Sequence, residues 1–187
     1  MLIFEDNAPS HRPARRTVRH GAYALIENDG RIAVDVLRTQ TRKIVDLPGG
    51  GLEWVRTDKD KLVLGKDGRP ILETEEQALI REVAEEIGLI VRPGARLAEA
   101  VQCYRSSDGR TDVLGYAALW TAEQVGEVPK TEPDHELDWL EPELAIRCLR
   151  HESHRLFVMK WLSWQQRNFG ELVVHPGRIP RRHRATP

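Results

Sequence analysis

Net charge is nearly absent from this sequence. Its 28 lysines and arginines are balanced by 29 aspartates and glutamates, which leaves a formal net charge of −1. A dedicated nucleic-acid-binding domain is usually clearly basic, so the balance argues against that class of protein. A small phosphorylated ligand is not excluded, because it needs only a local field. We therefore expect a small-molecule partner and no nucleic acid.

Cysteine and long apolar runs are also scarce. The two cysteines, Cys103 and Cys148, lie far apart and form no Cys-x-x-Cys pair, which favours reduced thiols over a disulfide or a zinc site. No run approaches the ~18 apolar residues that a membrane-spanning helix needs. Glu5 and Asp6 interrupt the apolar start of the chain, so no signal peptide is expected. These features predict a soluble, cytoplasmic protein.

The 187 residues, 40% of them hydrophobic and 30% charged, suit one globular domain. We predict that this domain covers residues 20–170. A basic, loose arm is expected over residues 1–19, and a basic tail over residues 171–187.

Hydrophobic periodicity and turn residues predict a mixed α/β (α+β) fold. The expected strands are 22–26, 31–37, 43–47, 61–64, 69–72, 97–104 and 111–121, and the expected helices are 74–87, 141–150 and 153–167. Residues 129–134 are expected to form a polar loop. Strands, one helix, more strands and terminal helices indicate a mixed sheet between helices, not the regular alternation of a doubly wound fold.

The first predicted helix has clear boundaries. Thr74 is a suitable N-cap, and Gln77 completes a capping box. Gly88 stands where a C-terminal glycine is expected. The apolar residues recur with the helical period, at Leu79, Ile80, Val83, Ala84 and Ile87.

Three glutamates share one face of this helix. Glu82, Glu85 and Glu86 are spaced i, i+3 and i+4, whereas Val83 and Ile87 point towards the core. Like charges at this spacing repel each other, and a hard divalent cation such as Mg²⁺ would offset the repulsion. Taken alone, the pattern leaves metal binding and a plain acidic surface helix equally open.

A glycine turn follows the third predicted strand, at Pro48-Gly49-Gly50-Gly51. Glycine allows the backbone to approach a ligand or metal closely. Taken alone, the turn is more simply a tight turn with no further role.

Together these residues resemble the Nudix box. Glu73, seven further residues and then Arg81-Glu82-Val83-Ala84-Glu85-Glu86-Ile87-Gly88-Leu89 match the second half of that signature, and Gly50 corresponds to its first glycine. Between Gly50 and Glu73 lie 22 residues where the family has five. We interpret the surplus of 17, at about residues 54–70, as a β-hairpin inserted before the Nudix helix. The resemblance implies the Nudix fold, an α/β/α sandwich around a mixed sheet.

The resemblance also implies roles for individual residues. Mg²⁺, with Mn²⁺ as a substitute, would be held by Glu82, Glu85, Glu86 and the Gly49 carbonyl. Arg81 and Glu73 would pair and brace the loop against the helix. The general base would be Glu82 or an acid outside the box, Glu132 or Glu136. The expected catalytic set is Arg81, Glu82, Glu85 and Glu136.

Gly50, Gly51, Glu53 and Arg42 are the candidates for contact with substrate. An exposed strand edge is the simpler interpretation of Arg42. The implied reaction is Mg²⁺-dependent hydrolysis of a phosphoanhydride bond in a nucleoside diphosphate linked to another group. A Nudix-shaped nucleotide sensor without turnover is the alternative, because the insertion could displace the glycine turn. Dimers are common in the family, so a homodimer is a further expectation.

Several aromatic and histidine residues have two interpretations. Trp54, beside the glycine turn, could stack on a base, but packing under the inserted hairpin is the simpler expectation. Trp161 and Trp164 lie on an apolar helix face that suits a core or a dimer contact. His151 and His154 have the spacing of a metal pair, but no third ligand is evident, which favours a surface or capping role.

Overall fold

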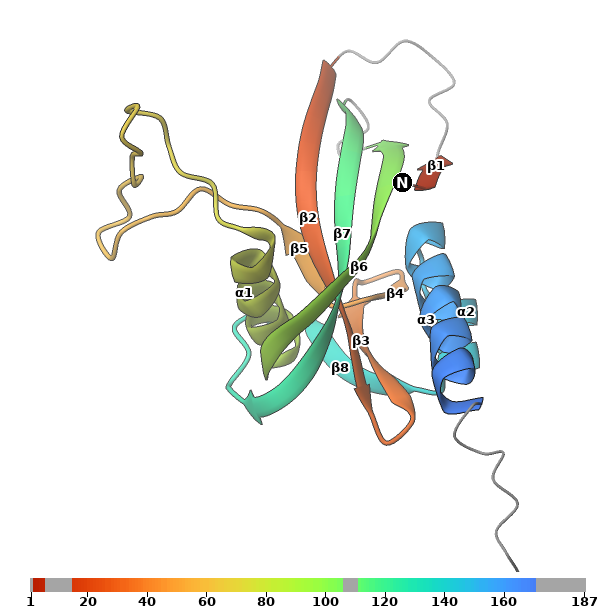
Figure 1. Ribbon diagram of the computed structural model, residues 1–187. Helices are drawn as coiled ribbons and strands as arrows, with labels where there is room; N and C mark the ends of the chain where they lie inside the picture. Colours follow the sequence, from red (N-terminus) through yellow and green to blue (C-terminus); the bar gives the residue numbers. More distant parts are fainter. Residues whose placement is uncertain (1, 6–14, 106–110, 171–187) are drawn as a thin grey trace, which may run out of the picture.

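A mixed β-sheet lies between α1 on one face and α2 and α3 on the other in the computed structural model, which describes residues 2–5, 15–105 and 111–170 (Figure 1). The strands are β1 (Leu2–Glu5), β2 (Arg15–Asn28), β3 (Arg31–Arg38), β4 (Lys43–Asp46), β5 (Gly49–Gly51), β6 (Leu89–Arg105), β7 (Thr111–Glu127) and β8 (His135–Leu140). The helices are α1 (Glu75–Ile87), α2 (Pro142–Cys148) and α3 (Glu152–Gly170). The predicted α/β/α sandwich is confirmed.

The sheet has the strand order β1-β6-β7-β2-β3-β4, with β5 paired to β2 and β8 paired to β3. Strand β2 runs parallel to β7 and antiparallel to β3 and β5. The β2–β3 turn has φ values of 49° at Asp29 and 78° at Gly30, as expected of a type I′ hairpin turn. The predicted long hairpin is present as β6 and β7, and it extends further than expected at its open end.

The loose arm expected over residues 1–19 is wrong for two segments. Residues 15–19 begin β2 and pair with residues 111–115 of β7, and Leu2–Glu5 pairs with residues 100–103 of β6. Residues 15–19 are polar and Leu2–Glu5 is very short, so neither has a strand-like alternation of apolar residues. Their pairing depends on backbone hydrogen bonds to strands far along the chain. The rest of the arm, at residues 6–14, and the tail at 171–187 lie outside the described residues.

Two hydrophobic cores lie on the two faces of the sheet, as strand alternation requires. In β3, Ile32, Val34 and Val36 pack towards α2 and α3, whereas Ala33 packs towards α1. Phe157 and Trp161 of α3 are buried in the first core, so the apolar face of this helix is a core face at these residues.

His154 is also fully buried, which corrects the expected surface or capping role. It lies on the inward side of α3, where its Nδ1 accepts a hydrogen bond from the Leu47 N–H at 3.4 Å. Cys103 and Cys148 are both free thiols. Of the helices that the structure describes, none has the length and apolar character needed to span a membrane.

Helix α1 has the predicted caps. The Thr74 side chain accepts a hydrogen bond from the Gln77 N–H, and the Gln77 side chain accepts one from the Thr74 N–H. Gly88 closes the helix with a φ of 71°. The helix contacts β2, β5, β6 and β8, which places its glutamates beside the glycine turn and the start of β8.

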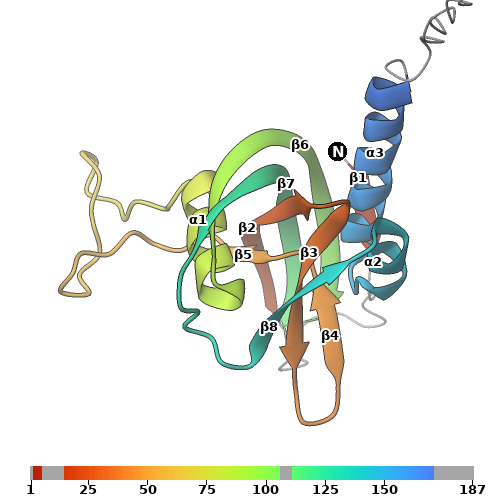
Figure 2. The same cartoon turned by 90° about the horizontal axis from the view of Figure 1, so that it is seen from below.

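The inserted segment projects away from the sheet before α1 (Figures 1 and 2). The predicted hairpin is present as a single antiparallel bridge between Leu64 and Pro70 across a turn at Gly65–Gly68. Residues 54–56, which lie in the predicted insertion but outside its expected strands, also take part: Trp54 pairs with Leu72, and Arg56 pairs with Leu62. Three short segments therefore share isolated bridges instead of forming two regular strands.

Candidate active site

The carboxylates of α1 differ in their exposure. The Glu82 and Glu86 side chains are only 14% and 11% exposed, whereas Glu85 is 38% exposed. Glu86 Oε2 accepts a hydrogen bond from the Gly49 N–H at 3.0 Å. Burial raises the pKa of Glu86 to about 9, although the hydrogen bond from Gly49 acts to lower it. The negative charges of Asp35, Glu82 and Glu132 also raise this pKa. The acidic face is thus a crowded, largely desolvated group and not a solvated surface.

The glycine turn lies directly against these carboxylates. A Cβ on Gly50 would stand 2.5 Å from the Glu82 Cδ, so any other residue there would have to displace the Glu82 carboxylate. Gly49 has a φ of 134°, and a Cβ on it would overlap the Ala22 carbonyl oxygen of β2. The 17-residue insertion therefore does not separate the turn from the helix.

Arg81 and Glu73 form the brace that the resemblance implies. Arg81 Nη2 and Nε donate to the two carboxylate oxygens of Glu73, at 2.6 and 3.2 Å, in the two-point geometry that arginine favours. Arg81 Nη2 also donates to the Gly51 carbonyl at 3.0 Å, and Glu73 accepts a hydrogen bond from the Glu53 N–H at 2.7 Å. One ion pair therefore ties the glycine turn, both ends of the insertion and α1 together.

Arg81 also contacts two glutamates of the acidic face. Its Nη1 lies 3.0 Å from Glu82 Oε1 and 2.9 Å from Glu85 Oε2. Burial alone would lower the pKa of Arg81, but its hydrogen bond to Glu73 and the charges around it raise that pKa above its ordinary value. Arg81 is therefore a fixed cation among the acids.

A second group of polar side chains reaches the acidic face from the sheet. His135 Nδ1 lies 2.8 Å from Asp35 Oδ2 of β3, and its Nε2 lies 3.1 Å from Glu132 Oε2. One ligand atom each from Asp35, Glu86 and His135 lies within 4.8 Å of the others. Neither Asp35 nor His135 was predicted from the sequence. The available signal was an aspartate in the middle of the apolar run of β3.

The loop before β8 is held against the end of α1. The N–H groups of Thr131 and Glu132 both donate to the Glu85 carbonyl at 3.1 Å. The Glu132 carboxylate is therefore close enough to raise the pKa values of Glu82 and Glu86, although burial is the main cause of both shifts. Of the two candidate acids outside the box, Glu132 is the one that the fold brings to the cluster.

These residues fit a divalent cation. Asp35 is 5% exposed, and its Oδ1 has no hydrogen-bond partner among the described residues. Burial raises the pKa of Asp35 above its ordinary value. The single positive charge of Arg81 cannot balance all of these carboxylates. Together with Asp35 Oδ1 they form the set of hard oxygen donors that suits Mg²⁺.

Two predicted site residues lie away from this cluster. Glu136 Oε2 pairs with Arg38 Nε at 2.7 Å, because Glu136 points to the opposite face of β8 from His135. Arg42 is exposed in the β3–β4 turn, where its N–H donates to the Thr39 hydroxyl. Within the described ranges, neither side chain has a recorded contact with the carboxylates of α1.

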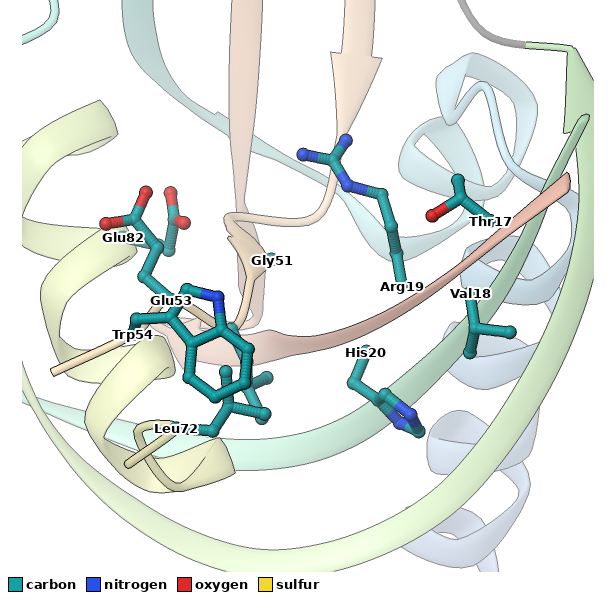
Figure 3. A pocket seen from close by; sticks show the side chains of 10 residues that line it. Thr17, Val18, Arg19, His20, Gly51, Glu53, Trp54, Leu72 and Glu82 are labelled. Atoms are coloured by element: carbon teal, nitrogen blue, oxygen red, sulfur yellow. The ribbon is translucent and has the colours of Figure 1, made fainter. Parts of the chain in front are cut away.

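A cavity of about 500 Å³ opens beside Glu82 (Figure 3). Gly51 and Glu53, two of the predicted substrate contacts, line it. Arg19 and His20 of β2 line it too, as does Trp54 of the inserted segment. Gly50, another predicted substrate contact, is not among the lining residues but lies against Glu82, which is. The site therefore combines clustered acids with an adjoining space of ligand size.

Comparisons with known proteins identify the fold and the family of this chain. The NUDIX domain family model matches residues 15–162, and the comparison with curated proteins gave no match. A NUDIX hydrolase from Nitrosomonas europaea has a similar structure, with a TM-score of 0.55 and 17% identity over 79% of this chain and 90% of that one. The MutT protein from Methanosarcina mazei Go1 has a TM-score of 0.53 and 21% identity over 81% of this chain and 97% of that one. These structures share the fold, and the family match covers most of the sequence. The chain therefore belongs to the Nudix family and is a pyrophosphohydrolase.

Proposed function

We propose that the protein hydrolyses the phosphoanhydride bond of a nucleoside diphosphate linked to another group, with Mg²⁺ as cofactor and Mn²⁺ as a substitute. The contact between Gly50 and Glu82 supports this proposal most directly, because it keeps the glycine turn on the acidic helix despite the insertion. That contact also removes the reason for proposing a sensor without turnover.

Glu82, Glu85, Glu86 and the Gly49 carbonyl would hold the cation. A bound divalent ion neutralises phosphate charge and makes an attacking water more acidic. Arg81 keeps the acids in place through Glu73, Glu82 and Glu85. Gly51 and Glu53 line the adjoining cavity and would face the substrate.

Glu132 is the general base that we favour outside the box. Its carboxylate lies 3.1 Å from His135 Nε2, and its loop is anchored to the end of α1. A base must lie within reach of the water whose proton it accepts, and Glu132 faces the acidic cluster, whereas Glu136 pairs with Arg38. Glu82 remains the candidate within the box.

Hydrolysis of a panel of nucleotide derivatives, measured with Mg²⁺ and with Mn²⁺, tests the proposal. We expect product from at least one member of the panel, and a loss of at least about 10²-fold in kcat for Glu85→Gln and Glu86→Gln. Glu76→Gln is the matched control, because Glu76 is an exposed residue in the first turn of the same helix. Full turnover in both site variants would reject the metal site.

A further inference from the structure

Trp54 brings the inserted segment to the edge of the candidate active site. It forms an antiparallel bridge with Leu72, at the point where the segment leaves and rejoins the domain. Both side chains line the 500 Å³ cavity together with Glu82 (Figure 3). The two ends of the insertion therefore supply an apolar wall beside the acidic helix.

The position of Trp54 is set by the same contacts that brace the Nudix box. Its neighbour Glu53 donates its N–H to the Glu73 side chain at 2.7 Å, and the Glu53 carbonyl accepts the Glu73 N–H at 2.9 Å. Glu73 in turn holds Arg81. Trp54 therefore directly follows Glu53, which is linked to α1 through Glu73 and Arg81. It lies at the base of the insertion and not at its tip.

The Trp54 side chain is only partly covered, although packing under the inserted hairpin was the simpler expectation from the sequence. The residue is 51% exposed. It lines a second cavity of about 330 Å³, which it shares with Gln77 and Arg81. A large aromatic surface left open beside a polar site is suited to a flat ligand, which would bury it.

The other wall of the cavity has a different chemistry. Arg19 and His20 come from β2 and lie across the cavity from Trp54 in Figure 3. The His20 ring stacks on Tyr116, with centroids 5.1 Å apart and an interplanar angle of 15°. The cavity therefore offers an acidic end at Glu82, an aromatic wall at Trp54 and a cation at Arg19, a combination that suits a ligand with both a planar ring and anionic groups.

We infer that Trp54 determines specificity by stacking on the planar base of a nucleotide whose phosphates lie towards Glu82. The inference rests on the proposed function for the nucleotide, and it adds which residue recognises the base. It gives the insertion a role in substrate selection, because Trp54 begins that segment and its bridge partner Leu72 lies just after the segment ends.

Calorimetric titration of the full chain with two probes, each in the presence of Mg²⁺, tests this inference. The probes are ADP and inorganic pyrophosphate, which has no ring. We expect the wild type to bind ADP more tightly than pyrophosphate. Trp54→Ala should weaken ADP binding by about tenfold, as expected for the loss of one stacked base, and leave pyrophosphate binding unchanged. Trp54→Phe should restore most of the loss.

Trp164→Ala is the matched control, because Trp164 is 53% exposed on α3 and does not line this cavity. It should bind both probes as the wild type does. Equal weakening of both probes by Trp54→Ala would show that Trp54 only supports the metal site, and the stacking role would be wrong. A wild type with no preference for ADP, or an unaltered Trp54→Ala, would also overturn the inference.

The titration, combined with the hydrolysis panel described above, separates this inference from the proposed reaction. Binding that depends on the base, in a protein that hydrolyses nothing, would reject the reaction and keep the role of Trp54. Hydrolysis by a protein in which Trp54→Ala does not change ADP binding would keep the proposed reaction and reject the role of Trp54.

Discussion

The carboxylate of Glu82 lies against the α-carbon of Gly50, so that a methyl group there would come 2.5 Å from the Glu82 Cδ. Gly50→Ala must therefore displace Glu82, the glycine turn or both. We expect a fall in kcat of about 10²-fold, because shifts of about 1 Å in a catalytic group have effects of that size. Steady-state kinetics on any substrate found in the panel measures it.

Gly126→Ala is the control for this substitution. The nearest atom to a Cβ on Gly126 is 3.5 Å away, in ordinary contact with Ile90. Its kinetics and its circular dichroism spectrum should match those of the wild type. A fully active Gly50→Ala protein would mean that the turn and the helix need not touch for catalysis.

The pair Glu132→Gln and Glu136→Gln distinguishes the two acids outside the box. Glu132 lies beside His135 and the acidic face, whereas Glu136 is paired with Arg38 on the other side of β8. We expect Glu132→Gln to lower kcat by about 10²-fold or more, the usual effect of losing a general base. Glu136→Gln should change kcat by less than about twofold, since it loses only an exposed ion pair. The reverse ranking would restore Glu136 as the catalytic acid.

The contrast between these two acids shows how far sequence reasoning reaches. The period of α1, its caps and the match to the Nudix box located Glu82, Glu85 and Glu86 correctly on one helix face. The box could not distinguish Glu132 from Glu136, because the choice depends on which face of β8 each side chain takes. That face is set by the pairing of β8 with β3, about 100 residues earlier in the chain.

Asp35 and His135 escaped prediction for the same reason. Asp35 belongs to β3 and His135 begins β8, and they become neighbours of Glu86 only when both strands pack against α1. The early start of β2 was missed because residues 15–19 have no apolar alternation and depend on β7 for their hydrogen bonds. Local patterns revealed the helix and its chemistry, and long-range pairing supplied the rest of the site.

Mg²⁺ should stabilise the fold through the acidic cluster. A ligand that binds only the folded state raises the midpoint of thermal unfolding, and Glu86 is 11% exposed among like charges. We expect added Mg²⁺ to raise the midpoint of the wild type, excess EDTA to reverse the shift, and Glu86→Gln to reduce it strongly. Differential scanning fluorimetry measures all three. A Mg²⁺ shift that is equally large in Glu86→Gln would place the cation elsewhere.

Removing charge from the cluster should not destabilise the fold when no metal is bound. Burial raises the pKa of the Asp35 carboxyl group, and one of its oxygens has no partner among the described residues. Asp35→Asn replaces this carboxylate with a neutral amide. We expect its thermal midpoint in EDTA to equal or exceed that of the wild type, because the substitution removes a buried negative charge that lies near Glu86 and Glu132. Its shift on adding Mg²⁺ should be smaller. A lower midpoint in EDTA would mean that the pair with His135 outweighs the cost of burying the charge.

His154 should make the fold sensitive to mild acid. Complete burial lowers its pKa well below 6.5, with further lowering by His151 and Arg150. The unfolded chain therefore binds this proton at a higher pH than the folded chain does. The contribution of His154 to the free energy of unfolding is fully present above about pH 6.5 and falls below that pH, by at most about 1.4 kcal/mol per pH unit. Protonation of Nδ1 would also break the hydrogen bond from the Leu47 N–H.

His154→Asn keeps a neutral acceptor but cannot titrate, so urea unfolding between pH 7.5 and about pH 5 should show a smaller loss of stability in this variant than in the wild type. Equal losses in the two proteins would assign the acid sensitivity to other groups.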